Sequence, residues 1–485
     1  MIKQLLLVFA LLSSLFATAQ IKLNIRWDQQ VRVSRSTPTL QVVVNPMLRR
    51  GSPIHEQSFR ALKNLQADYV RYVPWLPYPR LGVAELEPPT AQKTSWDFSL
   101  IDPIMMDFFE ATKGHPTIIN FSTIPQWMWK TEHKVTYPEN PDEVVWNYMQ
   151  GNTPRDTTMK EIADYYGRLF SWYTKAGFTD ELGKKHTSGH QYDIPYWEVL
   201  NEPDLEHNPT PAQYTKLYDA VVTNIKKIAP RTKFVGISVA FETNPSWFEY
   251  FLNPKNHKPG IPLDMISYHF YATSSRGQTV NEMQYTYFER ANGFLNMVRY
   301  IENIRMRYSP STKTTINEVG SILHNEEEPI FDLYWNLSGA LYAYLYLELT
   351  KIGIDIIGES QLVGYPTQFP SVSMMNWKNG KPNARYWVLK VIKDNFGPGD
   401  VLVGSGTEND STASLTMQAF KTKTGNKILL INRHNKTVTV NLPDAFNGGK
   451  VTIVDGVSGD NEPVTNTAGS VVELRPFAVA VVGWK

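Results

Sequence analysis

The sequence predicts an α/β fold: a (β/α)8 barrel followed by an antiparallel β-sandwich domain. Short apolar runs alternate with longer amphipathic stretches through most of the chain. Eight such strand–helix pairs precede Asn395, and after it short strands follow one another between Gly- and Asn-containing turns. A doubly wound open sheet is the competing fold. It would bring a glycine-rich phosphate loop after an early strand, and the sequence has none.

The predicted barrel covers residues 38–395. Its strands end in polar residues, glycine or proline, and its helices carry apolar residues on one face. The predicted strands are Leu40–Asn45, Asp68–Val73, Thr117–Ser122, Pro195–Leu200, Lys233–Val239, Asp264–Tyr271, Thr314–Val319 and Ile354–Ile357. The predicted helices are His55–Leu65, Leu100–Thr112, Met159–Ala176, Ala212–Ile228, Ser246–Leu252, Phe288–Tyr308, Leu337–Ile352 and Ala384–Asn395.

The predicted β-sandwich covers residues 396–485. The stretch from Ile21 to Val33 alternates in places and is a candidate for an additional strand of this domain. No Pro- or Ser-rich linker follows the barrel, so we expect the two domains to pack together. The predicted strands are Ser414–Phe420, Lys427–Asn432, Thr437–Leu442, Lys450–Asp455, Val471–Leu474 and Ala478–Val482.

Residues 1–19 have the features of a secretory signal peptide. Lys3 precedes the apolar run Leu5–Phe16, and Ala17-Thr18-Ala19 forms an A-x-A cleavage site before Gln20. The apolar run is too short to span a bilayer, so no membrane span is expected. The sequence therefore predicts a periplasmic or secreted protein.

Composition excludes several classes of function. A net charge of +1 gives no reason to expect a nucleic-acid partner. The absence of Cys excludes thiolate metal sites and thiol nucleophiles, and no H-E-x-x-H, G-x-S-x-G or P-loop motif is present. We therefore expect no cofactor and no metal, and the oligomeric state stays open. The 13 Trp and 25 Tyr suit a sugar-binding protein, because flat rings stack on the apolar face of a pyranose.

Two glutamates, Glu202 and Glu318, stand at the ends of the fourth and seventh predicted strands, each preceded by Asn. Barrel active sites lie at the carboxyl ends of the strands. Glycoside cleavage needs one carboxylic acid to protonate the leaving oxygen and one carboxylate at the anomeric carbon. An apolar neighbour such as Trp197 favours the protonated acid. The pair therefore predicts a glycoside hydrolase.

A family resemblance supports this prediction. Tyr196–Asp204, YWEVLNEPD, resembles the acid/base motif of the retaining glycoside hydrolases of clan A. Within that clan the chain is most similar to family 39, the β-xylosidase and α-L-iduronidase group. Ser122–Trp127 resembles its third-strand S-x-x-P-x-W loop, and Ser267–Tyr271 its sixth-strand His-aromatic segment. The resemblance implies Glu202 as general acid/base, Glu318 as nucleophile, and Asn201 as a hydrogen-bond partner of the sugar hydroxyl next to the anomeric carbon.

Other polar residues at strand ends are candidates for the same site. His269 and Tyr271 end the sixth strand and could orient Glu318 or bind sugar hydroxyls, although a satisfied core histidine is the alternative. Arg71 ends the second strand, where a cation could hold a carboxylate in place, or it could be a plain surface arginine.

Aromatic residues in the loops after the second and third strands could stack on sugar rings. Trp75 and Trp127 are the candidates, with Trp129 close by, and core packing is the alternative for any one of them. The segment that contains Asp204, Glu206 and His207 is expected to be a solvated loop.

These observations favour a retaining glycosidase that acts on an oligosaccharide or polysaccharide of plant or host origin by double displacement. Long aromatic loops suggest a pocket and therefore exo action. An endo-acting glycanase, or a transglycosylase with the same residues, would be consistent with the same pattern. A non-catalytic carbohydrate-binding protein on a glycosidase barrel is a further alternative, disfavoured because both carboxylates are present.

Overall fold

The computed structural model describes residues 20–133, 136–146, 148, 151–324, 330–366, 369–410 and 413–484. The predicted signal peptide, residues 1–19, lies outside the described residues. Within the described part of the chain, no helix combines the length and the apolar character that crossing a bilayer requires.

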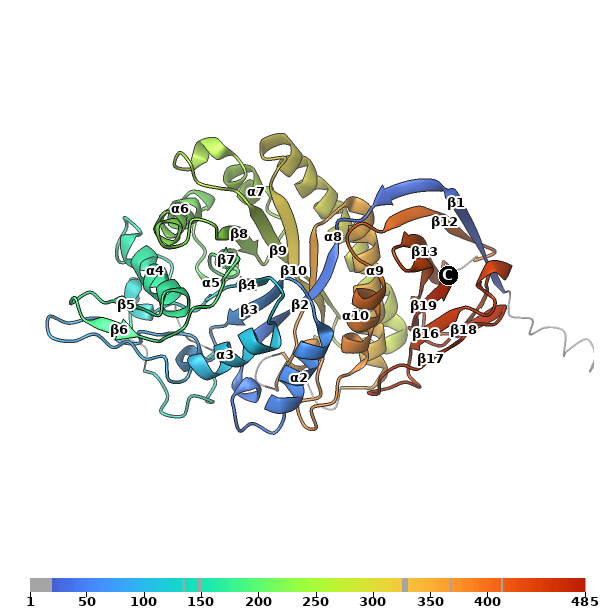
Figure 1. The fold of residues 1–485 in the computed structure, drawn as a ribbon, viewed down its shortest axis with the longest axis horizontal. Helices are drawn as coiled ribbons and strands as arrows, with labels where there is room; N and C mark the ends of the chain where they lie inside the picture. Colours follow the sequence, from blue (N-terminus) through green and yellow to red (C-terminus); the bar gives the residue numbers. More distant parts are fainter. Residues whose placement is uncertain are drawn as a thin grey trace, which may run out of the picture.

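Eight parallel strands form a closed barrel in the order β10-β11-β2-β3-β4-β7-β8-β9, which confirms the predicted (β/α)8 fold (Figure 1). The strands are β2 (Thr37–Val44), β3 (Val70–Pro74), β4 (Thr117–Ile119), β7 (Tyr196–Glu198), β8 (Lys233–Val239), β9 (Met265–Thr273), β10 (Lys313–Ile322) and β11 (Ile356–Glu359). The helices that follow them are α2 (His55–Leu65), α3 (Asp102–Ala111), α4 (Lys160–Thr174), α6 (Pro211–Ile228), α7 (Pro245–Phe251), α8 (Val280–Tyr308), α9 (Leu333–Ile352) and α10 (Ala384–Asn395).

Several elements differ from the predicted ones. Helix α8 begins at Val280 rather than at Phe288, because Thr279 and Glu282 form a reciprocal capping box ahead of it. Unpredicted short elements are α5 (Pro203–Glu206), the hairpin β5 (Gly177–Thr179) and β6 (Lys185–Thr187), and the 3-10 turns η2 (Pro46–Leu48), η3 (Pro79–Leu81), η4 (Gln126–Met128), η5 (Pro254–Asn256), η6 (Pro370–Val372) and η7 (Asp444–Phe446).

The second domain is one nine-stranded sheet in the order β17-β16-β19-β14-β13-β12-β1-β15-β18. The N-terminal strand β1 lies antiparallel to β12 and parallel to β15, so one pair departs from a fully antiparallel sheet (Figure 1). Strands β12 and β17 were not predicted. The strands are β1 (Ile21–Val33), β12 (Val401–Glu408), β13 (Leu415–Thr422), β14 (Gly425–Asn432), β15 (Val438–Asn441), β16 (Lys450–Val454), β17 (Thr465–Thr467), β18 (Val471–Leu474) and β19 (Val479–Trp484).

The sheet packs directly on the barrel. Successive side chains of a strand point to opposite faces, and β14 follows this period. Leu429 and Ile431 join the apolar core that the barrel and its helices share, whereas Ile428 and Leu430 join a second core inside the β domain. The barrel mouth is thus carried on a scaffold whose two domains share one continuous apolar core.

Candidate active site

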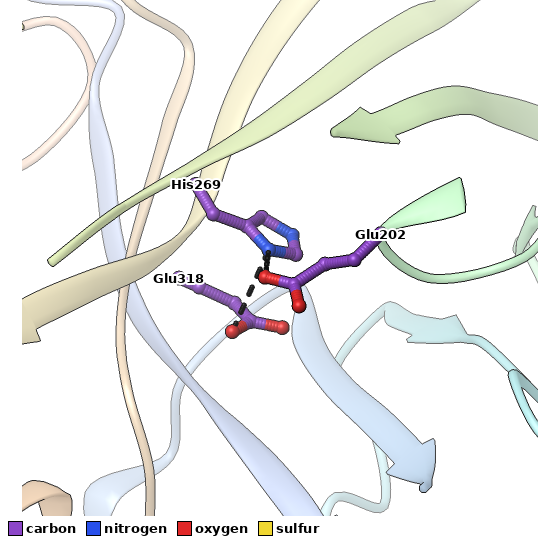
Figure 2. A group of neighbouring side chains, drawn as sticks. All are labelled: Glu202, His269 and Glu318. Carbon is purple, nitrogen blue, oxygen red and sulfur yellow. Dashed lines mark hydrogen bonds and ion pairs between the residues drawn. The ribbon is translucent and has the colours of Figure 1, made fainter. Parts of the chain in front are cut away.

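Three side chains from different parts of the barrel meet at its mouth (Figure 2). Glu202 follows β7, His269 lies on β9 and Glu318 on β10. The Nδ1 atom of His269 lies 2.7 Å from Oε1 of Glu202 and 3.6 Å from Oε2 of Glu318. A carboxylate oxygen of each glutamate and this imidazole nitrogen all lie within 4.8 Å of one another.

The backbone before Glu202 makes an unusual turn that directs the carboxyl group toward the mouth. Leu200 has φ 61° and Glu202 has φ 41°, both in the left-handed region that non-glycine residues rarely adopt. The amide of Glu202 donates to the carbonyl of Ser238 at 2.8 Å, and Pro203 begins the short helix α5. Such conformations cost about 1–3 kcal/mol each, and they concentrate at functional sites.

An irregularity in β10 positions Glu318. The register against β9 shifts between Thr315 and Glu318, and the register against β11 shifts between Ile316 and Val319. Irregularities of this kind reorient side chains next to active sites. Gly358 permits the close packing, because a Cβ there would lie 3.1 Å from the backbone of Asn317.

Arg71, on β3, fixes Glu318 from below. Its side chain is completely buried, and all of its nitrogens donate hydrogen bonds to side chains. The acceptors are Glu198 at 2.5 Å, Glu318 at 2.6 Å, Gln41 and Asn201 at 2.7 Å, and Ser238 at 3.1 Å. The predicted alternative of a surface arginine is wrong. Since Arg71 is 0% exposed, it holds a carboxylate and does not contact substrate directly.

Glu198, the last residue of β7, is a second buried partner of Arg71. Burial raises the pKa of its carboxyl, but the positive charge of Arg71 and several hydrogen bonds outweigh burial, so the net pKa is lowered. Besides Arg71, the donors are Asn120 at 2.7 Å, Ser267 at 2.5 Å and Asn317 at 2.9 Å.

The pKa values of the two mouth glutamates move in opposite directions. Burial raises the pKa of Glu202, and the negative charge of Glu318 adds to the effect, against an opposing contribution from His269. Burial also raises the pKa of Glu318, but the positive charges of His269 and Arg71, together with hydrogen bonds, outweigh it and bring the pKa below the usual value. Relative to the usual carboxyl pKa, the site therefore disfavours ionisation of Glu202 and favours ionisation of Glu318.

His269 and Tyr271 lie two residues apart on β9, and both face the carboxylates. Burial lowers the pKa of His269, but the charges of Glu318 and Glu202 outweigh it and raise the pKa overall. The hydroxyl of Tyr271 donates to Oε2 of Glu318 at 2.7 Å and forms a second hydrogen bond, of 2.6 Å, with the Ser360 hydroxyl.

A cavity of about 710 Å³ opens over these groups. Of the predicted site residues, Asn201, Glu202, Tyr271, Glu318 and Trp75 line it. His269 and Arg71 lie beneath them and act through the carboxylates.

Trp127 lies outside the lining of the cavity. Its indole N–H donates to the carbonyl of Glu85 at 2.9 Å, and the guanidinium of Arg155 covers its ring at 4.8 Å. Trp129 is buried, and its ring stacks on His207 at 4.3 Å. The structure therefore brings Trp75 to the cavity and places Trp127 and Trp129 in packing positions.

The segment after Glu202 is a helical turn packed into the site, so the prediction of a solvated loop is wrong. The carboxylate of Asp204 accepts from the amides of Ala240 and Phe241, both at 2.9 Å. Glu206 accepts from Asn201 at 2.9 Å and from the Trp75 indole at 2.8 Å. The positive φ at Glu202 turns this segment inward, a feature that the residue types alone do not signal.

The group formed by Glu202, His269 and Glu318 also has the ligand types that a divalent cation accepts. Each of the three side chains already has a hydrogen-bond partner on a neighbour: Glu202 on His269, His269 also on Ser238 at 3.2 Å, and Glu318 on Arg71 and Tyr271. Neighbouring side chains thus supply hydrogen-bond partners to all three groups, and the expectation that no metal is needed stays a prediction.

Solved structures with the same architecture are glycosidases in several cases. A GH51 α-L-arabinofuranosidase from Thermotoga petrophila RKU-1 superposes with a TM-score of 0.62 at 14% identity, over 96% of this chain and 100% of that one. A GH30 endoxylanase from Clostridium papyrosolvens C71 gives 0.58 at 13% identity, again over 96% and 100%. A conserved exported protein from Bacteroides fragilis gives 0.64 at 12% identity, with the same coverage. These likenesses show the fold of the chain, a barrel with an attached β domain, which it shares with these glycosidases.

At the level of family, residues 178–326 match the profile of "Glycosyl hydrolases family 39". This segment contains both mouth glutamates, and the match confirms the resemblance to family 39 over that range. Residues 414–482 match the profile "D-apionate lactonase, C-terminal immunoglobulin-like domain", in agreement with the β domain. Curated protein sequences give no match.

Proposed function

We propose that the protein is a retaining, exo-acting glycosidase that cleaves O-glycosidic bonds of a plant or host glycan by double displacement. In the first step, the Glu318 carboxylate attacks the anomeric carbon, and the glycosidic bond breaks as Glu202 protonates the leaving oxygen. In the second, Glu202 takes a proton from water, the water oxygen bonds to the anomeric carbon, and the ester to Glu318 breaks.

The observation that carries this proposal is the short distance between two carboxylates with opposite pKa shifts. An oxygen of Glu202 lies within 4.8 Å of one of Glu318. Retaining enzymes hold their carboxyl groups about 5–5.5 Å apart, whereas inverting enzymes need roughly 6.5–9.5 Å to admit a water. The raised pKa of Glu202 suits an acid, and the lowered pKa of Glu318 suits a nucleophile.

Replacing the nucleophile tests the covalent step. Glu318→Ala should lower turnover by several orders of magnitude while the protein stays folded. Azide should fit the vacated space, restore part of the activity and give a glycosyl azide of inverted configuration. NMR of the wild-type reaction should show the product anomer retained from the start. An inverted first product, or near-normal turnover of Glu318→Ala, would overturn the retaining assignment.

Replacing the acid tests the role of Glu202. A nitrophenolate leaves with little protonation, so Glu202→Ala should lose less activity on a nitrophenyl glycoside than on a disaccharide. The pH profile of kcat/KM should rise as Glu318 ionises and fall as Glu202 loses its proton, and this basic limb should flatten in the variant. Equal losses on both substrates with an unchanged profile would assign Glu202 a structural role.

The proposal of exo action rests on an aromatic group at one end of the cavity. The rings of Trp75, Trp146 and Phe369 lie with their centroids 5.6–6.0 Å apart, and Trp75 and Phe369 line the cavity. A panel of nitrophenyl glycosides and polysaccharides distinguishes the two modes. Release of single sugars supports exo action, whereas a rapid fall in polymer length supports the endo alternative.

We also propose that the protein is secreted or periplasmic, on the basis of the signal-peptide features of residues 1–19. Mass spectrometry of the exported protein should find a mature N-terminus at Gln20. An intact N-terminus in the cell interior would contradict this.

A further inference from the structure

The cavity extends beyond the two glutamates on one side of the barrel mouth. Part of its wall comes from the loop after β8, with Phe241, Glu242 and Thr243. The facing wall comes from helix α8, where Arg290, Gly293 and Met297 lie on one face at helical spacing. We call this part of the cavity the α8 lobe. The opposite part, the β2 lobe, is lined by Gln41, Trp75, Gln361 and Phe369.

If the proposed function holds, the hydrogen bonds around Asn201 show which lobe takes which part of the substrate. The Asn201 amide donates to Glu206, which also accepts from the indole of Trp75, so Asn201 belongs to the β2 lobe. The family resemblance implies that Asn201 binds the hydroxyl next to the anomeric carbon, so the sugar that bonds to Glu318 occupies the β2 lobe. Glu202 delivers its proton to the leaving oxygen, and the group attached to that oxygen extends into the α8 lobe.

The α8 lobe is tied to the acid/base by backbone contacts. Asp204, two residues after Glu202, accepts hydrogen bonds from the amides of Ala240 and Phe241. The loop that carries Phe241 is therefore fixed relative to the carboxyl group that protonates the leaving oxygen. A leaving group held against this loop would be aligned with the proton donor.

The chemistry of the lobe suits a sugar ring. Phe241 is 54% exposed, and an added Cβ at Gly293 would meet nothing within 4 Å, so the wall from α8 leaves room for a ligand. Glu242 is half-buried and Arg290 is exposed, and neither has a hydrogen-bond or ion-pair partner on another described residue. A flat apolar face beside one free acceptor and one free donor matches a pyranose, which has an apolar face and a rim of hydroxyls.

We propose that the α8 lobe is a binding site for a sugar leaving group, with the ring on Phe241 and its hydroxyls on Glu242 and Arg290. The inference rests on the proposed function and deepens it. The substrate is then an oligosaccharide recognised on both sides of the cleaved bond, and not only through the sugar that is released.

Two substrates with the same glycone and the same anomeric configuration test the proposal: a glycosyl fluoride, whose leaving fluoride is too small to fill the α8 lobe, and a disaccharide, whose leaving sugar occupies the lobe. Phe241→Ala should lower kcat/KM about 10- to 100-fold for the disaccharide, the range expected for losing a buried aromatic contact. The glycosyl fluoride should change by less than about threefold. Arg290→Ala should show the same selectivity with a smaller loss.

Two variants serve as matched controls. Tyr300 is an exposed aromatic on α8 outside the cavity lining, so Tyr300→Ala should leave both substrates unchanged. Phe369 lines the β2 lobe, so Phe369→Ala should affect both substrates alike. Equal losses on both substrates in Phe241→Ala, or a loss on the glycosyl fluoride alone, would overturn the proposal.

A second measurement tests whether the α8 lobe binds a sugar that acts as the acceptor of the glycosyl group. A free sugar should accelerate turnover of a trapped glycosyl-enzyme, because its hydroxyl attacks the anomeric carbon, gives its proton to Glu202 and releases Glu318. Phe241→Ala should lose this acceleration while hydrolysis by water continues. Unchanged acceleration contradicts the lobe assignment. Absence of any glycosyl-enzyme in the wild type would instead contradict the proposed function.

Discussion

The barrel mouth contains two buried arginine–glutamate pairs with opposite electrostatic outcomes. In one, Glu198 accepts hydrogen bonds from Arg71 and three further side chains, and its pKa is lowered. In the other, Glu359 accepts from Arg385 at 3.0 Å, and burial raises its pKa to about 8. The second carboxylate oxygen of Glu359 is buried without a hydrogen-bond partner.

The difference shows that a single arginine does not by itself keep a buried carboxylate charged. Arg385 also donates to the backbone carbonyls of Ser360 and Ser371, so only part of its donor capacity reaches Glu359. All the nitrogens of Arg71 donate to side chains of the site, and two of these side chains are carboxylates. Desolvation favours the neutral form unless enough donors surround the charged one. The pKa values of Glu318 and Glu198 are thus lowered because both carboxylates accept hydrogen bonds from Arg71 and from further side chains.

Among the changes that test this comparison, exchanging each arginine for lysine has the largest expected effect. Arg71→Lys keeps a positive charge but loses the planar five-donor geometry, so Glu318 should shift and kcat should fall about 100-fold or more. Arg385→Lys is the matched control, because Glu359 does not line the cavity. It should lower the melting temperature while activity stays within a few-fold of wild type. Similar activity losses in both variants would show that the Arg71 network is only structural.

A smaller effect is expected from Tyr271→Phe, which removes one donor from Glu318. A hydrogen bond to a charged group contributes about 1.5–3 kcal/mol, so kcat/KM should fall roughly 10- to 100-fold. The pKa of Glu318 should rise, because a bond that stabilises its charged form is gone. The acidic limb of the pH profile should therefore move to higher pH. An unmoved limb would exclude Tyr271 from the electrostatics of Glu318.

The smallest effect on activity is expected for Glu359→Gln, whose consequence is pH-dependent stability. The folded-state pKa of about 8 lies above the unfolded value, so the neutral carboxyl of Glu359 contributes to the free energy of unfolding at low pH. That contribution is lost as the pH rises toward 8, with a slope of at most about 1.4 kcal/mol per pH unit. Urea unfolding at pH 5, 6.5 and 8 should show a steeper fall of stability in wild type than in the variant, because other carboxyls with raised pKa values, such as Glu85, titrate in both. Parallel curves would mean that Glu359 is ionised throughout.

The fold was largely predictable because barrel strands and helices have distinct periods. Helix α10 and strand β8 begin and end where the pattern predicted. Strand β12, VLVGSGTE, was missed because half of it is glycine and small polar residues, which resemble a turn more than a strand.

The two mouth glutamates were predictable from their places at strand ends, but their supporting network was not. Gln41, Ser238 and Ser360 act only because the strand register turns them inward, and register is invisible in a single sequence. Glu198 did leave a signal. A charged residue inside the apolar run YWEV is almost never buried alone, and Arg71 inside VRYV is its complement.

Strand β1 makes the second domain discontinuous along the chain, since Lys22 pairs with Glu408 while the whole barrel lies between them. Synthesis delivers β1 first and its partners β12 and β15 only after the barrel sequence is complete. Contacts between such distant residues form slowly, because a long loop must close before they stabilise anything. The C-terminal sheet therefore stays incomplete until the two ends of the chain meet. A substitution in β1, just after the predicted cleavage site, should consequently destabilise the C-terminal domain, which is the part of the chain farthest from it in sequence.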